Sequence, residues 1–217
     1  TRNYIKLRGS KMDFERYEFT LDCDHPDWLT DTRHVKVIYE FLMANDFTRV
    51  AEIGSYSGVS TAAFIEALNQ GKNFKLHIAE PNPTRQLRAL LSMCKKPDNV
   101  MLHVQVGADL LEHWKDFDFL FVDGNHNIDG AGAELLMILR NKIPTVMAHD
   151  TNLFSTCSNH NGKGSELLGR VLKIHPEYMT IEDKEERLNE KTHRGLLLAT
   201  TNKEKYKIGK TVFEKLC

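Results

Sequence analysis

The chain has few cysteines, almost no net charge and no long apolar run. Its four cysteines are far apart and lack the paired spacing of a zinc site or a disulfide framework, so a reducing compartment fits best. With 29 Lys and Arg residues against 30 Asp and Glu residues, no overall positive field attracts nucleic acid or anionic lipid. No segment approaches the roughly 20 apolar residues of a membrane span. We therefore expect a soluble, cytoplasmic protein.

The chain does have enough apolar residues for a large core. It is 41% hydrophobic and 27% charged, the composition of a globular protein, and a chain of this size buries roughly 70% of its unfolded surface. Short apolar runs, such as 49–53, 74–79, 117–122 and 145–148, alternate with amphipathic stretches of helical period. This alternation predicts an α/β fold: one doubly wound, mostly parallel seven-stranded sheet with helices on both faces.

The pattern divides the single domain (1–217) into three parts. We expect residues 1–30 to form an N-terminal arm or lid, residues 31–200 the core and residues 201–217 a C-terminal tail or edge element. Within the core, the Asn-, Ser- and Gly-rich stretch 151–164 follows a strand, which is where such sheets bind ligands. The tail prediction rests on lysines that alternate with other residues, namely Lys203, Lys205, Lys207 and Lys210.

The strongest motif is the segment 50–60 (VAEIGSYSGVS), which predicts a strand, a glycine-bearing turn and the start of a helix. Such a turn lets a ligand approach the backbone, and the helix start offers free N–H groups. A dinucleotide fingerprint would need glycines where Tyr56 and Val59 stand, which disfavours an NAD-dependent oxidoreductase. No Gly-Lys-Ser/Thr follows Gly54 or Gly58, so a P-loop is absent.

The spacing E-x-G-x-x-x-G resembles the first motif of class I S-adenosylmethionine-dependent methyltransferases. An acid at the end of the next strand can accept both hydroxyls of a ribose. A G-A-D turn follows the third predicted strand, where that family borders the adenine, and another acid leaves the fourth strand toward the expected methionine end. The resemblance implies a Rossmann-like fold and S-adenosylmethionine as cofactor, bound by Glu52, Gly54, Ser55, Tyr56, Gly58, Ser60, Glu80, Gly107, Ala108, Asp109 and Asp123.

The turn 54–58, within a resemblance covering roughly 49–152, is most similar to that of catechol O-methyltransferase-like and metal-dependent sugar O-methyltransferases. These enzymes hold a metal through one Asp after strand four and another after strand five, where this chain has Asp123 and Asp150. Their third ligand, a carboxylate or amide, comes next in sequence, and here Thr151 departs from that pattern but occupies the position. Oxygen ligands favour Mg²⁺, with Mn²⁺ or Ca²⁺ as alternatives.

The resemblance also assigns a base. In these relatives it lies three residues past the first metal Asp, and here that residue is His126. Methyl transfer to oxygen needs the hydroxyl deprotonated, and an imidazole titrates near the working pH. A bound cation would lower the pKa of the hydroxyl and leave less for the base to do. The implied activity is methylation of a small hydroxylated or sugar acceptor.

Two other functions stay open. A methyltransferase fold does not establish activity, so a non-catalytic S-adenosylmethionine-binding or structural domain of a larger chain is one alternative, favoured by Thr151 and by Thr1 in place of an initiator Met. A nucleic-acid methyltransferase is the other. That class typically carries an Asp/Asn-Pro-Pro-aromatic turn where this chain has D-G-N-H at 123–126, and the neutral charge also argues against it. No motif specifies the acceptor or an oligomeric state.

Overall fold

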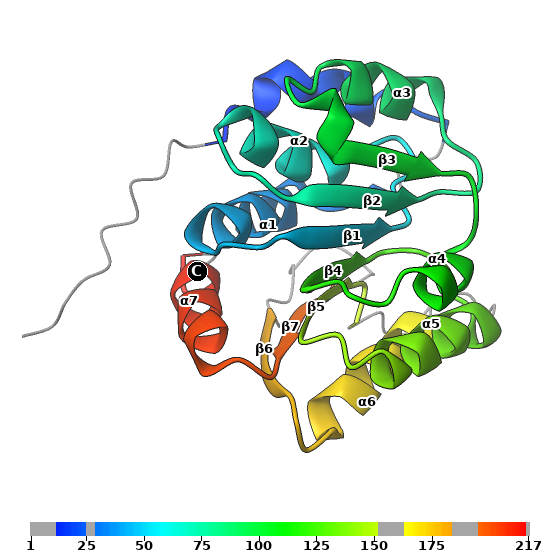
Figure 1. Cartoon of the computed structure of the whole chain (residues 1–217), viewed down its shortest axis with the longest axis vertical. Helices are drawn as coiled ribbons and strands as arrows, with labels where there is room; N and C mark the ends of the chain where they lie inside the picture. The colour runs from blue at the N-terminus through cyan, green and yellow to red at the C-terminus, as the bar shows by residue number, and fades with distance from the viewer. Residues whose placement is uncertain (1–11, 25–28, 152–162, 184–194, 216–217) are drawn as a thin grey trace, which may run out of the picture.

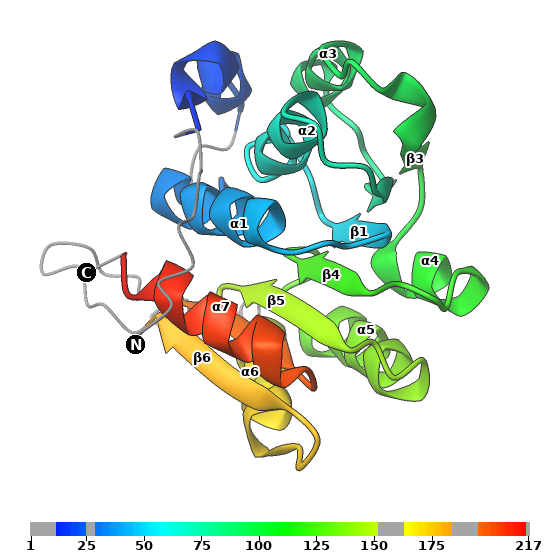
Figure 2. The same cartoon turned by 60° about the vertical axis from the view of Figure 1, so that its left-hand side comes forward.

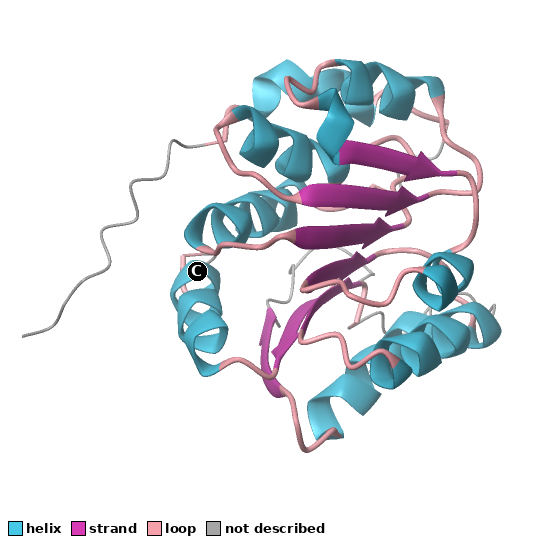
Figure 3. Ribbon diagram, in the orientation of Figure 1, coloured by secondary structure: helices cyan, strands magenta, loops and turns pink. Residues whose placement is uncertain are grey.

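The computed structural model describes residues 12–24, 29–151, 163–183 and 195–215. Most of the predicted ligand-binding stretch 151–164 therefore lies outside the described residues. Figures 1 and 3 show the elements, which in chain order are η1 (Phe14–Leu21), α1 (Thr32–Ala44), β1 (Arg49–Ile53), α2 (Thr61–Asn69), β2 (Lys75–Ala79), α3 (Arg85–Ser92), η3 (Pro97–Asn99), β3 (Val100–His103), α4 (Gly107–His113), β4 (Phe119–Val122), α5 (Ile128–Arg140), β5 (Thr145–His149), α6 (Lys163–Ile174), β6 (Met179–Asp183), β7 (Leu196–Thr200) and α7 (Lys203–Phe213).

The strands form one seven-stranded sheet in the order β3-β2-β1-β4-β5-β7-β6. Strands β1 to β5 are parallel, while β7 runs antiparallel to both β5 and β6. The chain winds outward from β1 in one direction and from β4 in the other, and such a reversal leaves a crevice at the carboxyl ends of these two strands. The predicted doubly wound, mostly parallel sheet is confirmed.

Helices cover both faces of the sheet, with α1, α2 and α7 on one side and α4, α5 and α6 on the other (Figure 2). Strand β4 illustrates how the sequence builds both layers. Phe119 and Phe121 belong to the core under α1 and α2, whereas Leu120 and Val122 belong to the core under α5 and α6. Because successive side chains point to opposite faces, a fully apolar strand is what a sheet buried on both sides requires.

Side-chain caps fix two helix starts that border the carboxyl edge of the sheet. The Asp31 carboxylate accepts the N–H of Arg33 at 2.8 Å, so α1 starts at Thr32. The Asn127 side chain accepts the N–H of Gly130 at 2.7 Å at the start of α5. Each such cap contributes about 1 kcal/mol. The caps hold the residues just before α1 and α5 in place beside the site.

The N-terminal segment, expected to be an arm or lid, packs on the domain over residues 12–24. Tyr17 is fully buried and donates a hydrogen bond to Glu66 of α2. Burial and the neighbouring Glu66 carboxylate raise the pKa of Tyr17, so its hydroxyl stays a donor. Arg16 adds an ion pair to the same carboxylate at 3.7 Å. The contact anchors η1 over α2.

The tail prediction for residues 201–217 was wrong, because the structure has helix α7 there. Its lysines alternate with other residues along the sequence, but Ile208, Val212 and Phe213 gather on one face of the helix and pack into the core beside α1. Asn202 caps the helix by accepting the N–H groups of residues 204 and 205. Helical spacing of apolar residues, rather than the strand-like alternation of lysines, decided the structure.

Among the described residues, no helix is both long and apolar enough to cross a bilayer.

Candidate active site

The loop between β1 and α2 is pressed against the end of β4. Gly54 has φ +80°, and a Cβ at this position would lie 2.2 Å from the carbonyl oxygen of Asp123. The N–H of Asp123 in turn donates to the carbonyl of Ile53 at 2.8 Å. Both the left-handed backbone and the close approach exclude any side chain at Gly54. The glycine thus places the predicted cofactor loop directly beside the predicted metal ligand.

Glu80, at the carboxyl end of β2, holds this loop from the other side. Its Oε2 accepts the N–H of Ser55 at 3.1 Å and that of Tyr56 at 2.8 Å, and its Oε1 accepts the N–H of Asn82 at 2.8 Å. Tyr56 itself has φ +45° and is fixed in part by these bonds. From the sequence we expect Glu80 to accept the hydroxyls of a ribose. In the structure its carboxylate accepts N–H groups of the loop that would bind the cofactor.

A small cleft opens between the loop and the segment before α1. Of the predicted residues it brings together Gly54, Ser55, Tyr56 and Asp123. The sequence reading missed the others that line it, which are Leu29, Thr30, Ser57 and Val59. Ser57 and Val59 lie inside the motif, but nothing in the sequence around Thr30 signals a site.

Glu52 and Ser60 lie behind the loop rather than at its surface. Glu52 is fully buried, and its carboxylate accepts the hydroxyls of Ser60 at 2.6 Å and Thr61 at 2.7 Å. Burial raises the pKa of Glu52 to about 7, although the hydroxyls of Ser60 and Thr61 oppose that shift. Gly58, in the same loop, has φ +96° and lies close to the leucine side chains of α3. These residues brace the loop against the first turn of α2.

The predicted adenine turn belongs to helix α4, which begins at Gly107 rather than after Asp109. A Cβ at Gly107 would lie 2.3 Å from Cγ2 of Ile53 and 2.8 Å from Oε1 of Glu134. Ala108 is half-buried and Asp109 is exposed at the carboxyl edge of the sheet. Glu134 was missed by the sequence reading, although an acid on the core-facing side of an apolar helix is a usable signal. Its burial raises the pKa of Glu134 to about 8.

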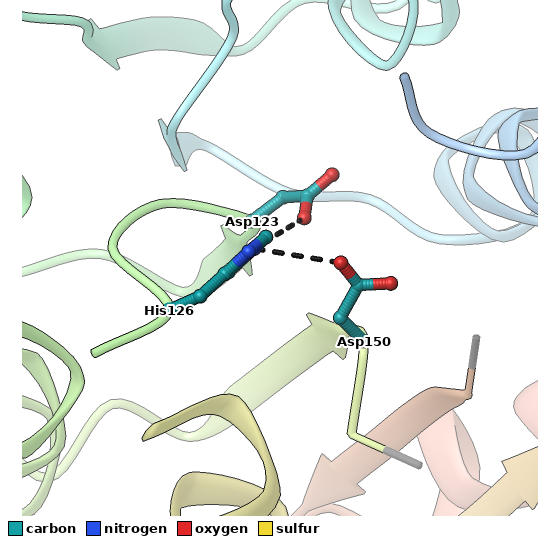
Figure 4. Close-up of side chains that lie close together, drawn as sticks. All are labelled: Asp123, His126 and Asp150. Carbon is teal, nitrogen blue, oxygen red and sulfur yellow. Dashed lines mark ion pairs between the residues drawn. The ribbon is translucent and has the colours of Figure 1, made fainter. Parts of the chain in front are cut away.

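The acids at the ends of β4 and β5 meet, as expected for neighbouring parallel strands. Figure 4 shows His126 between them, with its Nε2 3.5 Å from Oδ1 of Asp123 and 3.5 Å from Oδ2 of Asp150. One donor atom from each of the three residues lies within 4.8 Å of the others. The structure therefore brings the predicted base and both predicted metal acids to one point.

Hydrogen bonds and nearby charges shift the pKa values of Asp123 and His126. Thr30 donates its hydroxyl to Oδ2 of Asp123 at 2.7 Å, and Nδ1 of His149 lies 3.2 Å from Oδ1. Burial opposes ionisation of Asp123, but the charge and hydrogen bonds of His149 and His126 outweigh it and lower the pKa of Asp123 below its ordinary value. For His126, burial would lower the pKa, yet the hydrogen bond and charge of Asp123, with the charge of Asp150, raise it.

The donor set fits a divalent cation. Oδ1 of Asp150 is buried and, among the described residues, has no hydrogen-bond partner. Asp150 also has φ +57°, a left-handed conformation that costs a non-glycine residue about 1 kcal/mol. A carboxylate with an unsatisfied buried oxygen, held on strained backbone opposite a second carboxylate, is what a cation would neutralise.

Thr151, the predicted third ligand, is buried next to Asp150. Its methyl group packs where α6 comes close: a Cβ at Gly169 would lie 2.9 Å from Cγ2 of Thr151. In the part of the chain that the structure describes, its Oγ1 is buried without a hydrogen-bond partner. Ligation by Thr151 stays a prediction, and His126 is the third group that the structure brings to the acids.

The segment that carries the glycine loop and both acids matches a known family model. Residues 51–151 match the model described as a methyltransferase domain. Over this segment the chain is similar to methyltransferase domains. The recognition drawn from the sequence motifs is confirmed at this level, and a comparison with curated protein sequences finds no significant match.

Solved structures share the fold of this chain. An O-methyltransferase from Bacillus cereus, in complex with S-adenosylhomocysteine, is 13% identical with a TM-score of 0.69, covering 90% of this chain and 93% of that one. The O-methyltransferase TomG from Streptomyces achromogenes, in complex with S-adenosylmethionine, is 16% identical with a TM-score of 0.70, covering 91% and 93%. The S-adenosylhomocysteine-bound methyltransferase PaMTH1 from Podospora anserina is 17% identical with a TM-score of 0.67, covering 86% of each chain.

Proposed function

We propose that the chain is an S-adenosylmethionine-dependent O-methyltransferase that uses a divalent cation, Mg²⁺ in the first place, and acts on a small hydroxylated or sugar acceptor. The observation that carries this proposal is the convergence of Asp123, His126 and Asp150 within 4.8 Å, beside the cleft of the glycine loop. The dispersed cysteines of the sequence support a cytoplasmic location.

The cofactor would lie along the carboxyl edge from β4 to β3. We expect the methionine end between the glycine loop and Asp123, because these residues line the cleft. Glu80 follows on β2 for the ribose, and the start of α4 follows β3 for the adenine. We assign cofactor binding to the loop and edge residues Gly54, Ser55, Tyr56, Gly58, Glu80, Gly107, Ala108 and Asp109, with Glu52 and Ser60 supporting the loop from behind.

Asp123 and Asp150 would hold the cation, which when bound lowers the pKa of the acceptor hydroxyl. His126 would accept the hydroxyl proton at Nε2, the nitrogen that faces both acids. The acceptor oxygen then attacks the methyl carbon in line, the carbon–sulfur bond breaks, and its electrons stay on sulfur to leave neutral S-adenosylhomocysteine. Positioning of the two substrates supplies much of the rate in such a reaction.

Calorimetry tests the proposal most directly. The purified protein is titrated with S-adenosylmethionine in the presence of Mg²⁺, and saturable one-to-one binding is the expected result. Acceptors bearing vicinal hydroxyls are then screened for release of S-adenosylhomocysteine. No binding of S-adenosylmethionine would contradict the proposal. Binding without turnover on any hydroxylated acceptor would instead favour a non-catalytic binding domain.

A further inference from the structure

A line of buried side chains runs from the acid pair to the far edge of the sheet. Nδ1 of His149 lies 3.2 Å from both Oδ1 of Asp123 and Oδ1 of Asp150. The other nitrogen of His149, Nε2, lies 3.0 Å from Nδ1 of His34. Nε2 of His34 then lies 2.8 Å from Oδ2 of Asp183. Each histidine contacts one neighbour through each of its two ring nitrogens, so the acid pair, His149, His34 and Asp183 form one continuous path.

The fold builds this line from one row of the sheet. Leu196 of β7 pairs with His149 of β5 on one side and with Asp183 of β6 on the other. Directly paired residues share a face, and Leu196 packs into the core that α1 covers. The first turn of α1 lies over this row and inserts His34, which is fully buried, between His149 and Asp183. The helix thereby bridges two side chains that the strand between them keeps apart.

The chemistry of the end groups sets the orientation of His149. An ionised carboxylate only accepts hydrogen bonds, so Asp123, whose Oδ1 lies 3.2 Å from Nδ1 of His149, requires a hydrogen on that nitrogen. Nε2 of His149 and Nδ1 of His34 lie 3.0 Å apart, so one ring donates to the other across this contact. Asp183, which also accepts from Arg33 at 2.7 Å, accepts from Nε2 of His34 at 2.8 Å and so fixes the plane of that ring.

We propose that His34 is a positioning residue for the acid pair: it holds His149 with its Nδ1–H toward Asp123 and Asp150, and so preorganises both carboxylates for a divalent cation. This inference rests on the proposed metal-binding function and adds a residue outside the matched segment 51–151. Hydrogen bonds to ligating carboxylates orient them, and loss of such partners typically lowers metal affinity by about 10–100-fold.

Two amide substitutions separate this role from simple filling of space. In His34→Asn the amide nitrogen can occupy the place of Nδ1 and still donate to His149, whereas in His34→Gln it occupies the place of Nε2 and reaches only Asp183. Titration of the metal-free protein with Mn²⁺ by calorimetry should give an affinity close to wild type for His34→Asn. The same titration should give a loss of about 10–100-fold for His34→Gln.

The matched control is His77→Asn. His77 is also buried and also pairs with a second histidine, His103, at 3.1 Å between ring nitrogens, but its ring neighbours are Trp114 and Phe117 rather than acids. Its replacement should leave Mn²⁺ affinity unchanged. A loss in His77→Asn equal to that in His34→Gln would overturn the proposal, because general destabilisation would then explain both.

Equal Mn²⁺ affinity of wild type, His34→Asn and His34→Gln would also overturn the proposal while leaving the proposed function intact. A wild-type protein that binds S-adenosylmethionine but no Mn²⁺ would overturn it together with the metal part of the proposed function. A measurement without variants covers the case in which these proteins fail to fold. In ¹⁵N spectra of the wild-type imidazoles, Nδ1 of His149 should carry a proton, and a bare Nδ1 would contradict the proposal.

Discussion

The two halves of the carboxyl edge, one around the β1 loop and one around the acid pair Asp123 and Asp150, differ in how their carboxylates are neutralised. Around the β1 loop, both carboxylates are neutralised by hydrogen bonds: Glu80 accepts two loop N–H groups and Glu52 accepts two hydroxyls. Around the acid pair, charge is concentrated and only partly neutralised, with a buried Oδ1 of Asp150 that has no hydrogen-bond partner in the described structure.

The difference indicates a division of labour. A loop whose backbone is held by the Glu80 carboxylate and that has little room for side chains has a fixed shape, which suits a binding surface for a cofactor. An acid pair whose negative charge is only partly neutralised can bind a cation and can stabilise a protonated His126. Substitutions in the acid half should therefore reduce turnover, whereas substitutions in the glycine half should reduce stability and cofactor binding. The four predictions below test this separation.

The largest effect should follow His126→Ala. Removal of a general base typically reduces the rate by about 10²–10⁴-fold. Affinity for S-adenosylmethionine, measured by calorimetry, should change little because His126 is not among the residues that line the loop cleft. His175→Ala, in a connection at the end of α6, serves as the control and should keep full turnover. Unchanged turnover in His126→Ala would remove this residue from the mechanism.

Next comes Asp150→Asn. Asparagine tolerates the left-handed backbone at this position, so the fold should persist while one negative charge of the acid pair is lost. Stimulation of turnover by Mg²⁺ should disappear, and Mn²⁺ should bind at least about 10-fold more weakly. Asp116→Asn, an exposed acid before the amino end of β4, is the control, because Asp123 follows the opposite end of that strand. Turnover that is insensitive to a chelator in the wild type would argue against the cation altogether.

The acid pair was predictable from sequence because its placement follows from topology alone. Asp123 and Asp150 each follow an apolar strand, and the carboxyl ends of neighbouring parallel strands meet wherever the helices dock. The glycine loop was predictable for the same reason, since its glycines sit at a fixed distance from the end of β1. In both cases the strand that precedes the residue positions it.

The residues that the sequence did not reveal depend on how helices dock on the sheet. Thr30 reaches Asp123, and His34 reaches His149, only because α1 lies over β5 and β7 at one particular rotation, which no local pattern encodes. Helix α7 was missed because regularly spaced lysines obscured the apolar face made by Ile208, Val212 and Phe213. Tertiary packing, rather than local propensity, decides such positions.

A smaller effect, measured here as a loss of stability, should follow Gly54→Ala in the glycine half. The new Cβ would lie 2.2 Å from a backbone oxygen, at φ +80°. Gly71→Ala is the matched control, since Gly71 has φ +106° but nothing within 4 Å of the added Cβ. The control should lose about 1 kcal/mol in urea unfolding, and Gly54→Ala about 1–3 kcal/mol more. Equal losses would mean that the loop moves freely away from β4.

The last prediction concerns Glu134, which lies under Gly107 and Gly124 where the two halves meet. Burial raises the pKa of Glu134 from an ordinary 4.5 to about 8. Between these values the folded protein holds a proton that the unfolded chain has lost, so the free energy of unfolding falls as pH rises. Glu134→Gln cannot ionise but can still accept a hydrogen bond, so it should remove about 2–4 kcal/mol of that decline between pH 5 and 8. If the free energy of unfolding fell equally with pH in Glu134→Gln and wild type, burial would not raise the pKa of Glu134, and the prediction would be wrong.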